Sequence, residues 1–151
     1  MPAVGYSGTP LPKKLGIREG QTVVLLDAPP DIEREIEPLP ADVKFNRGLP
    51  KGAALEMVLL FTTKKRAFQS HLRAVESALA DDGTLWVCWP KKASGVPTEV
   101  GEADVREIGL ASGLVDVKVC AVTEIWSGLK FVRRLVDRKS KVQSRKSKVP
   151  K

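Results

Sequence analysis

The fold of this chain is decided by residues 56–89, which read EMVLLFTTKKRAFQSHLRAVESALADDGTLWVCW. The stretch begins with an almost continuous apolar run, as expected for a strand that is covered on both faces. Phe68, Leu72, Val75 and Leu79 then recur at spacings of four, three and four, which places them on one stripe of a helix. Gly83 lies just past the end of that helix, and the run TLWVCW predicts a second buried strand.

The same alternation of strands and helices extends along the rest of the chain. Further strands are expected at residues 22–26, 42–45, 115–122 and 129–136, and further helices at 13–15, 31–37 and 103–112. The last two strands are separated by a short loop, which is typical of an antiparallel pair. The pattern predicts an α/β fold, a single Rossmann-like and mostly parallel sheet closed by a C-terminal antiparallel strand pair.

Composition and charge divide the chain into three parts. We expect an N-terminal arm at residues 1–14, one α/β domain at 15–136 and a basic tail at 137–151. The net charge of +7 lies almost wholly in the tail, whose seven Lys or Arg and single Asp leave only +1 for the remainder. The tail has few apolar residues to bury, so it is expected to be disordered.

Cysteine usage and the absence of long apolar runs indicate the cellular setting. Cys88 and Cys120 both lie inside apolar runs, where a reduced and buried thiol is the commoner outcome. No metal-ligand spacing is present. No secretory signal is recognised, and no apolar run approaches the roughly 20 residues that span a bilayer. A cytoplasmic location without membrane contact is therefore expected.

Two segments resemble a known enzyme class. Residues 15–27, LGIREGQTVVLLD, and residues 78–87, ALADDGTLWV, are similar to parts of class I S-adenosylmethionine-dependent methyltransferases. The resemblance implies a cofactor held by glycines after the first strand and by an acidic residue after the second. This chain instead has Asp27-Ala-Pro-Pro and Asn46-Arg-Gly at those places. Prolines remove amide donors and add bulk where glycine is wanted, which argues against ordinary methyltransferase catalysis.

Longer matches resemble a narrower group. The segments YSGTPLPKKLGI at 6–17, WPKKASGVPT at 89–98, GLVDVKVCA at 113–121 and WSGLKF at 126–131 are similar to a small bacterial family, frequent in actinobacteria, that is known as a domain of unknown function. This resemblance implies a Rossmann-like fold and no established activity.

A ligand site is expected where the carboxyl ends of the strands meet, because open α/β sheets bind ligands there. Cations at 64–66 and 91–92, together with a helix start, favour an anion, and cations in a first helical turn are otherwise unfavourable. We expect the loop after residue 90 to leave its hydroxyls free and Thr62 or Thr63 to cap the helix. The alternative is that these cations simply face solvent. The candidate ligand-binding residues are Asp27, Thr63, Lys64, Lys91, Lys92, Ser94, Gly95, Thr98 and Trp126.

Other reactive groups offer little chemistry. His71, the single histidine, is interpreted as a partly covered surface residue, and Cys88 as a core residue. No nucleophile and base form a recognisable set. Trp126, placed in a hairpin loop, is expected either to pack under an arm containing Tyr6 or to line a pocket.

Three functions are compatible with these residues. The first is a non-catalytic module that binds a small phosphate- or carboxylate-bearing ligand at the carboxyl edge of the sheet. The second is a divergent methyltransferase-like enzyme. The third is a nucleic-acid-associated or protein-interaction module that acts through weak, non-specific phosphate contacts of Arg138–Lys151. Cofactor identity and oligomeric state are left open.

Overall fold

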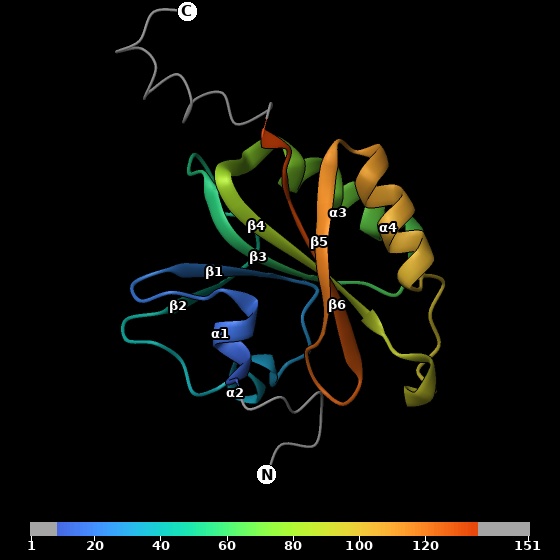
Figure 1. Ribbon diagram of the computed structural model, residues 1–151, viewed down its shortest axis with the longest axis horizontal. Helices are drawn as coiled ribbons and strands as arrows, with labels where there is room; N and C mark the ends of the chain where they lie inside the picture. Colours follow the sequence, from blue (N-terminus) through green and yellow to red (C-terminus); the bar gives the residue numbers. More distant parts are fainter. Residues whose placement is uncertain (1–8, 136–151) are drawn as a thin grey trace, which may run out of the picture.

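Strands and helices alternate along residues 9–135, the part of the chain that the computed structural model describes (Figure 1). The elements are α1 (Leu11–Leu15), β1 (Thr22–Leu26), α2 (Ile32–Glu35), β2 (Lys44–Arg47), β3 (Leu55–Phe61), α3 (Lys65–Ala78), β4 (Leu79–Pro90), the 3-10 turn η1 (Lys92–Ser94), α4 (Glu102–Ala111), β5 (Leu114–Ala121) and β6 (Trp126–Arg133). The predictions for Tyr6 and for the basic tail fall outside the described residues. Within residues 9–135 the helices are too short or too polar to cross a membrane.

The strands form one six-stranded sheet in the order β2-β1-β3-β4-β6-β5. The first four pair in parallel, and β6 runs antiparallel to both β4 and β5. This arrangement confirms the expected mostly parallel sheet with an antiparallel C-terminal pair. It also makes β1 and β3 neighbours, with Leu26 opposite Leu60 at their carboxyl ends.

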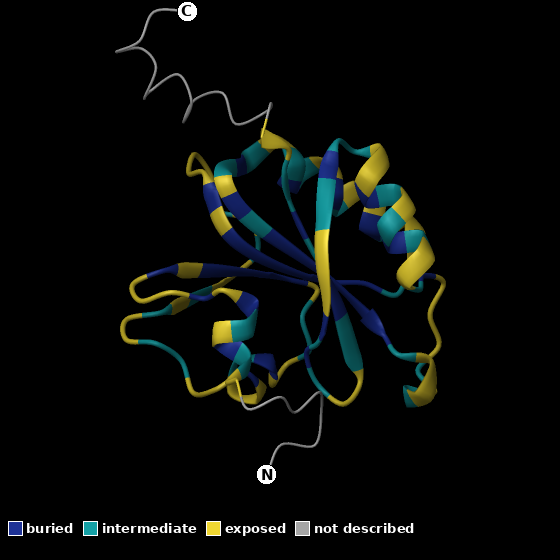
Figure 2. Ribbon diagram, viewed as in Figure 1, coloured by how far each residue is buried: buried dark blue, intermediate teal, exposed yellow. Residues whose placement is uncertain are grey.

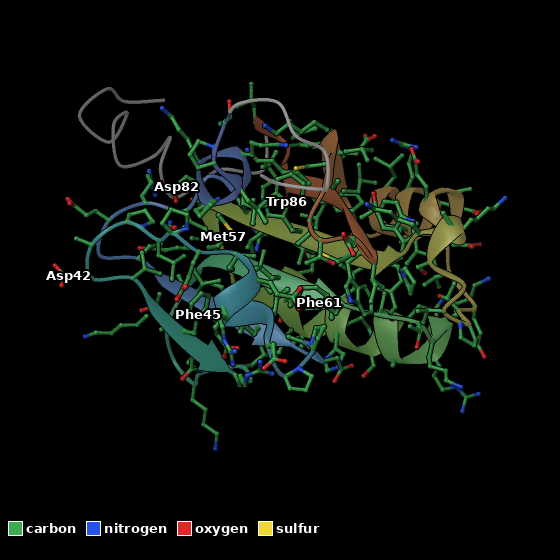
Figure 3. The ribbon with its side chains drawn as sticks, turned by 90° about the horizontal axis from the view of Figure 1, so that it is seen from below. Asp42, Phe45, Met57, Phe61, Asp82 and Trp86 are labelled. Carbon is green, nitrogen blue, oxygen red and sulfur yellow. The ribbon has the colours of Figure 1, made fainter. Side chains whose placement is uncertain are left out.

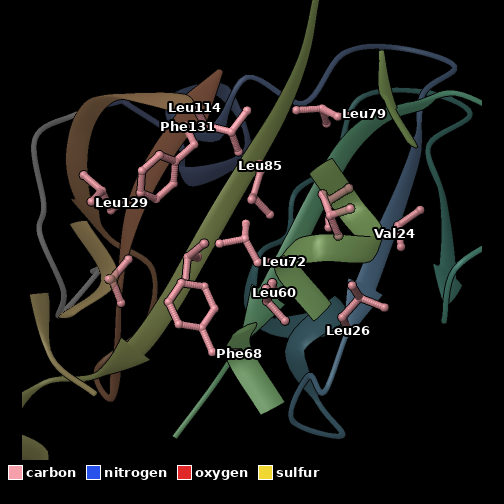
Figure 4. Packing of buried hydrophobic residues seen from close by; sticks show 14 of the residues in the cluster. Val24, Leu26, Leu60, Phe68, Leu72, Leu79, Leu85, Leu114, Leu129 and Phe131 are labelled. Carbon is pink, nitrogen blue, oxygen red and sulfur yellow. The ribbon is translucent and has the colours of Figure 1, made fainter. Parts of the chain in front are cut away.

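Helices cover both faces of the sheet, and each face has its own core. On one face, Phe68 and Leu72 of α3 pack toward Leu60, Leu85 and other strand residues (Figure 4). The opposite core, with α1 and α2, contains Met57, Phe61 and Trp86 (Figure 3). Figure 2 shows the result, in which the central strands are buried and the exposed residues concentrate on helices and loops.

Some boundaries differ from the sequence-based expectation. Gly83 does not follow the helix end; α3 ends at Ala78, and Gly83 lies inside β4, where a Cβ atom would come within 2.5 Å of the Leu55 carbonyl oxygen. The glycine is therefore required by a close approach of two strands rather than by helix termination. β6 begins at Trp126, so this tryptophan opens a strand instead of lying in the hairpin loop.

Candidate functional site

A hollow of about 230 Å³ opens at the carboxyl edge of the sheet, between the ends of β1 and β3, the start of α3 and the start of β6. Its walls are formed by Asp27, Phe61, Thr62, Thr63, Lys64, Ala67 and Trp126. Four of the residues singled out from the sequence, Asp27, Thr63, Lys64 and Trp126, thus meet in one place. They converge because the parallel strands β1 and β3 both end at this edge.

The other five candidates, Lys91, Lys92, Ser94, Gly95 and Thr98, lie in the loop after β4 and do not line this hollow. The loop nevertheless borders the same edge, since the Thr98 Oγ1 hydroxyl lies 3.4 Å from the Thr63 carbonyl oxygen. The expectation of free hydroxyls in this loop is wrong. Ser94 donates to the Lys91 carbonyl at 2.7 Å and Thr98 donates to the Val100 carbonyl at 2.9 Å.

The start of α3 receives its negative charge from within the chain. The Glu99 carboxylate accepts a hydrogen bond of 2.9 Å from the Lys65 amide, and Asp104 lies 3.9 Å from the Lys65 ammonium. Neither threonine is the N-cap residue of the helix. That residue is Lys64, which makes no capping hydrogen bond with its side chain, and the Thr62 hydroxyl donates to the Lys64 carbonyl. The cations of the first turn are therefore explained in part by internal acids, and that argument for a bound anion loses force.

Four of the five cations at 64–66 and 91–92 have no acidic partner within residues 9–135. Lys65 is paired with Asp104, whereas no carboxylate lies within 4.0 Å of Lys64, Arg66, Lys91 or Lys92. Exposed lysines are well hydrated and need no partner for stability. Their grouping still adds positive charge to this edge near Asp27, the carboxylate that lines the hollow.

Asp27 is bonded to the only histidine of the chain. The Nε2 atom of His71 lies 3.0 Å from Oδ2 of Asp27, and the two side chains are 31% and 54% exposed. His71 is thus partly covered, as expected. Asp27 has a φ of 53°, in the left-handed region that non-glycine residues seldom adopt. This backbone conformation places an aspartate where the chain leaves β1 and turns away from the sheet.

Trp126 and Phe61 form the aromatic wall of the hollow. Their ring centroids are 5.1 Å apart and their planes meet at 87°, an edge-to-face contact. Of the two roles expected for Trp126, lining a pocket is the one that the described residues display; the alternative involves Tyr6, which lies outside them.

The cysteines do not take part in this site. Both are free and buried, and burial raises the pKa of the Cys88 thiol far above its ordinary value and that of Cys120 in the same direction. A raised pKa disfavours the reactive thiolate, in agreement with a core role. The stretch from residue 9 to residue 135 brings no three His, Cys, Asp or Glu side chains together in a way that could hold a metal ion.

The loop after β1 is held by a guanidinium group. Arg47, at the end of β2, donates to the carbonyl oxygens of Ala28, Pro29 and Pro30 at 2.8 to 3.2 Å, and to both carboxylate oxygens of Glu33 at 2.8 and 2.9 Å. The hydrogen bond from Arg47 lowers the pKa of the Glu33 carboxyl. We call these five residues the Arg47 clamp. In the sequence, Arg47 stood out only because it lies where the resemblance implies an acidic residue.

The clamp bears directly on the cofactor that the sequence resemblance implies. S-adenosylmethionine bound in the usual way needs amides after β1 and an acid after β2. Here carbonyls converge on a cation, two amides are replaced by proline nitrogens, and β2 ends in a basic residue, Arg47, that is followed by Gly48. The residues of this loop do not fit that mode of binding.

Similar solved structures carry the same fold. A SAM-dependent methyltransferase from Aquifex aeolicus is 14% identical, with a TM-score of 0.54 and coverage of 79% of this chain and 85% of that one. A DhpI-SAH complex is 12% identical, with a TM-score of 0.54 and 83% of each chain covered. LepI in complex with SAH and a substrate analogue is 14% identical with a TM-score of 0.53; the match covers 82% of this chain but only 39% of LepI. Identities this low show a methyltransferase-like fold and nothing finer.

Sequence comparison identifies the family. No match was found among curated protein sequences. Residues 13–135 match the family described as "Protein of unknown function (DUF3052)", which accounts for most of the chain. The protein therefore belongs to the DUF3052 family.

Proposed function

We propose that this protein is a non-catalytic module that binds a small phosphate- or carboxylate-bearing ligand in the hollow at the carboxyl edge of β1 and β3. The observation that supports the proposal is the hollow itself, which is lined by Lys64. Lys91 and Lys92, in the loop that borders the same edge, have no acidic partner within residues 9–135. A cation that lines a recess can form a charge-assisted hydrogen bond with an anion. The buried thiols of Cys88 and Cys120, whose raised pKa disfavours the thiolate, favour binding over cysteine-based nucleophilic chemistry.

Calorimetry with inorganic phosphate, acetate and AMP tests this proposal on the full chain. We expect saturable binding of at least one of them, and a loss of about tenfold in affinity in Lys64→Gln, because a hydrogen bond to a charged group contributes roughly 1.5–3 kcal/mol. Lys51→Gln is the matched control, since Lys51 is an exposed lysine before β3, at the amino edge of the sheet. No binding of any anion, or equal affinities in the two variants, would overturn the proposal.

A methyltransferase-like activity is the second candidate, and the fold favours it: the Aquifex aeolicus protein of similar fold is a SAM-dependent methyltransferase. The Arg47 clamp argues against it. Calorimetry with S-adenosylmethionine decides between the two. Saturable binding to the unaltered chain would favour the enzyme hypothesis over ours, whereas binding that emerges only in Arg47→Ala would show that the clamp excludes the cofactor.

A further inference from the structure

The hollow is lined by one positive and one negative side chain. A ligand that is only an anion would be attracted by the positive one alone. Asp27 and Lys64 line it together, yet they form no ion pair with each other. We infer that the ligand is a small zwitterion of the amino-acid class, with its carboxylate near Lys64 and its ammonium near Asp27. This inference rests on the proposed anion site and adds the cationic half of the ligand.

The carboxylate of Asp27 has capacity left for a ligand. His71 contacts only Oδ2, and no Lys or Arg of the described range lies within 4.0 Å of either oxygen. A carboxylate can accept about four hydrogen bonds, so Oδ1 can receive an ammonium group. His71 acts as a positioning residue, because its contact fixes one oxygen of a side chain that is otherwise half exposed.

The other acids of this edge are already engaged. Glu99 accepts from the Lys65 amide, Asp104 accepts from the Gly101 amide and lies near Lys65, and Glu33 is held by Arg47. Asp27 is therefore the carboxylate of the hollow that lacks a Lys or Arg partner among residues 9–135. A pure anion bound beside Lys64 would be repelled by it, whereas an ammonium on the same ligand would be attracted.

The size and the walls of the hollow agree with a molecule of this kind. A volume of about 230 Å³ lies below the roughly 300–1,000 Å³ of pockets for drug-sized ligands, and so suits a small molecule. Phe61, Ala67 and Trp126 supply an apolar wall for an aliphatic side chain. L-valine, with eight non-hydrogen atoms and both charges, has these properties.

Three matched probes test the inference on the full chain by calorimetry. L-valine carries both charges, 3-methylbutanoate lacks the ammonium and isobutylamine lacks the carboxylate; the remaining standard L-amino acids are screened by thermal shift. We expect L-valine, or another amino acid of the screen, to bind at least tenfold more tightly than either singly charged analogue.

Two variants and one control assign the contacts. Asp27→Asn keeps the shape of the side chain, and asparagine tolerates the left-handed backbone. It should weaken amino-acid binding about tenfold and leave 3-methylbutanoate unchanged or tighter, while Lys64→Gln should weaken both. Asp42→Asn is the control, since Asp42 also has a positive φ, of 61°, and lies exposed before β2.

The possible failures are distinguishable. If 3-methylbutanoate binds as tightly as L-valine and Asp27→Asn changes nothing, the zwitterion inference is wrong and the proposed anion site stands. If no amino acid of the screen binds while phosphate or acetate does, the same conclusion follows. If isobutylamine alone binds, or no probe binds at all, both the inference and the proposed function are overturned.

Discussion

Two regions flank the carboxyl end of β1, and they differ in what fills them. On the β2 side, the Arg47 clamp draws the carbonyls of the loop after β1 onto a guanidinium group. On the β3 side, Asp27 and Lys64 face a hollow without pairing with each other. The first, closed region satisfies its polar groups within the chain, whereas the second, open region keeps an aspartate and a lysine beside a hollow without an ion pair between them.

The largest expected effect is on stability, from the floor of the open region. Phe61 is fully buried, whereas Phe45 on the β2 side is only partly buried. Phe61→Ala should lower the free energy of unfolding by about 3–5 kcal/mol, because it leaves a cavity beneath Trp126. Urea denaturation measures the loss, with Phe45→Ala as the matched control. Equal losses in the two variants would contradict the comparison.

A smaller effect is expected in the closed region. Arg47→Ala should free the loop after β1 and speed hydrogen exchange of the Ile32 amide, which donates to the Pro29 carbonyl. Arg34→Ala, which removes a highly exposed pair with Asp31, should not.

The pH dependence of this variant has a defined sign. Because Arg47 lowers the pKa of Glu33, the interaction stabilises the fold above the ordinary glutamate pKa of about 4.3 and is lost as the pH falls through the lowered native value. The difference in melting temperature between the unaltered chain and Arg47→Ala should be full near pH 7 and shrink toward pH 3. A constant difference would show that the salt link contributes nothing.

Glu99 joins the loop after β4 to the start of α3. Glu99→Ala removes the acceptor of the Lys65 amide and should lower stability by about 0.5–2 kcal/mol, as losses of helix caps do. Glu124→Ala, an exposed loop residue, is the control. Thermal denaturation reports the difference, and an unchanged melting temperature would mean that the helix start needs no internal anion.

The last effect is kinetic and follows from the loss of stability in Phe61→Ala. Cys88 is buried opposite Phe61 in the register of β3 and β4, so its labelling by a thiol reagent reports opening of this part of the sheet. Labelling at pH 8 should be slow in the unaltered chain and faster in Phe61→Ala, by about tenfold per 1.4 kcal/mol of lost stability. Arg47→Ala should change it less. Equal acceleration by both variants would mean that the two regions open together.

Sequence predicted β1 and β3 well and other strands less well; β4 begins at Leu79, which was expected in the helix, five residues before its predicted start. The residues of β1 were predicted without error and those of β3 within one residue, because a strand buried on both faces leaves a continuous apolar run. β2 is displaced by two residues from its expected place, and most of its residues are exposed, so it carries no such run. β6 begins three residues early because its pairing with β4, not its composition, sets its start.

The same division holds for the candidate site. Asp27, Thr63 and Lys64 could be grouped from the sequence because parallel strands end at one edge. The contact of His71 with Asp27 spans 44 residues and depends on how α3 packs, so no local sequence pattern could predict it. Whether Lys91 and Lys92 would line the hollow also depended on the path of a loop, which has no periodic pattern to predict it.

The amino-acid sequence by itself determined the α/β class, the buried strands and the edge of the sheet where the candidate site residues lie. It could do so because local apolar patterns indicate which strands are buried and in which order strands and helices follow. Only the tertiary structure decided which polar groups satisfy one another. Arg47 donates to three carbonyls, Glu99 accepts from the start of α3, and Asp27 contacts His71 while lining the same hollow as Lys64. Such pairings depend on distances of a few ångströms between segments far apart in the chain, and these distances exist only after the sheet has packed.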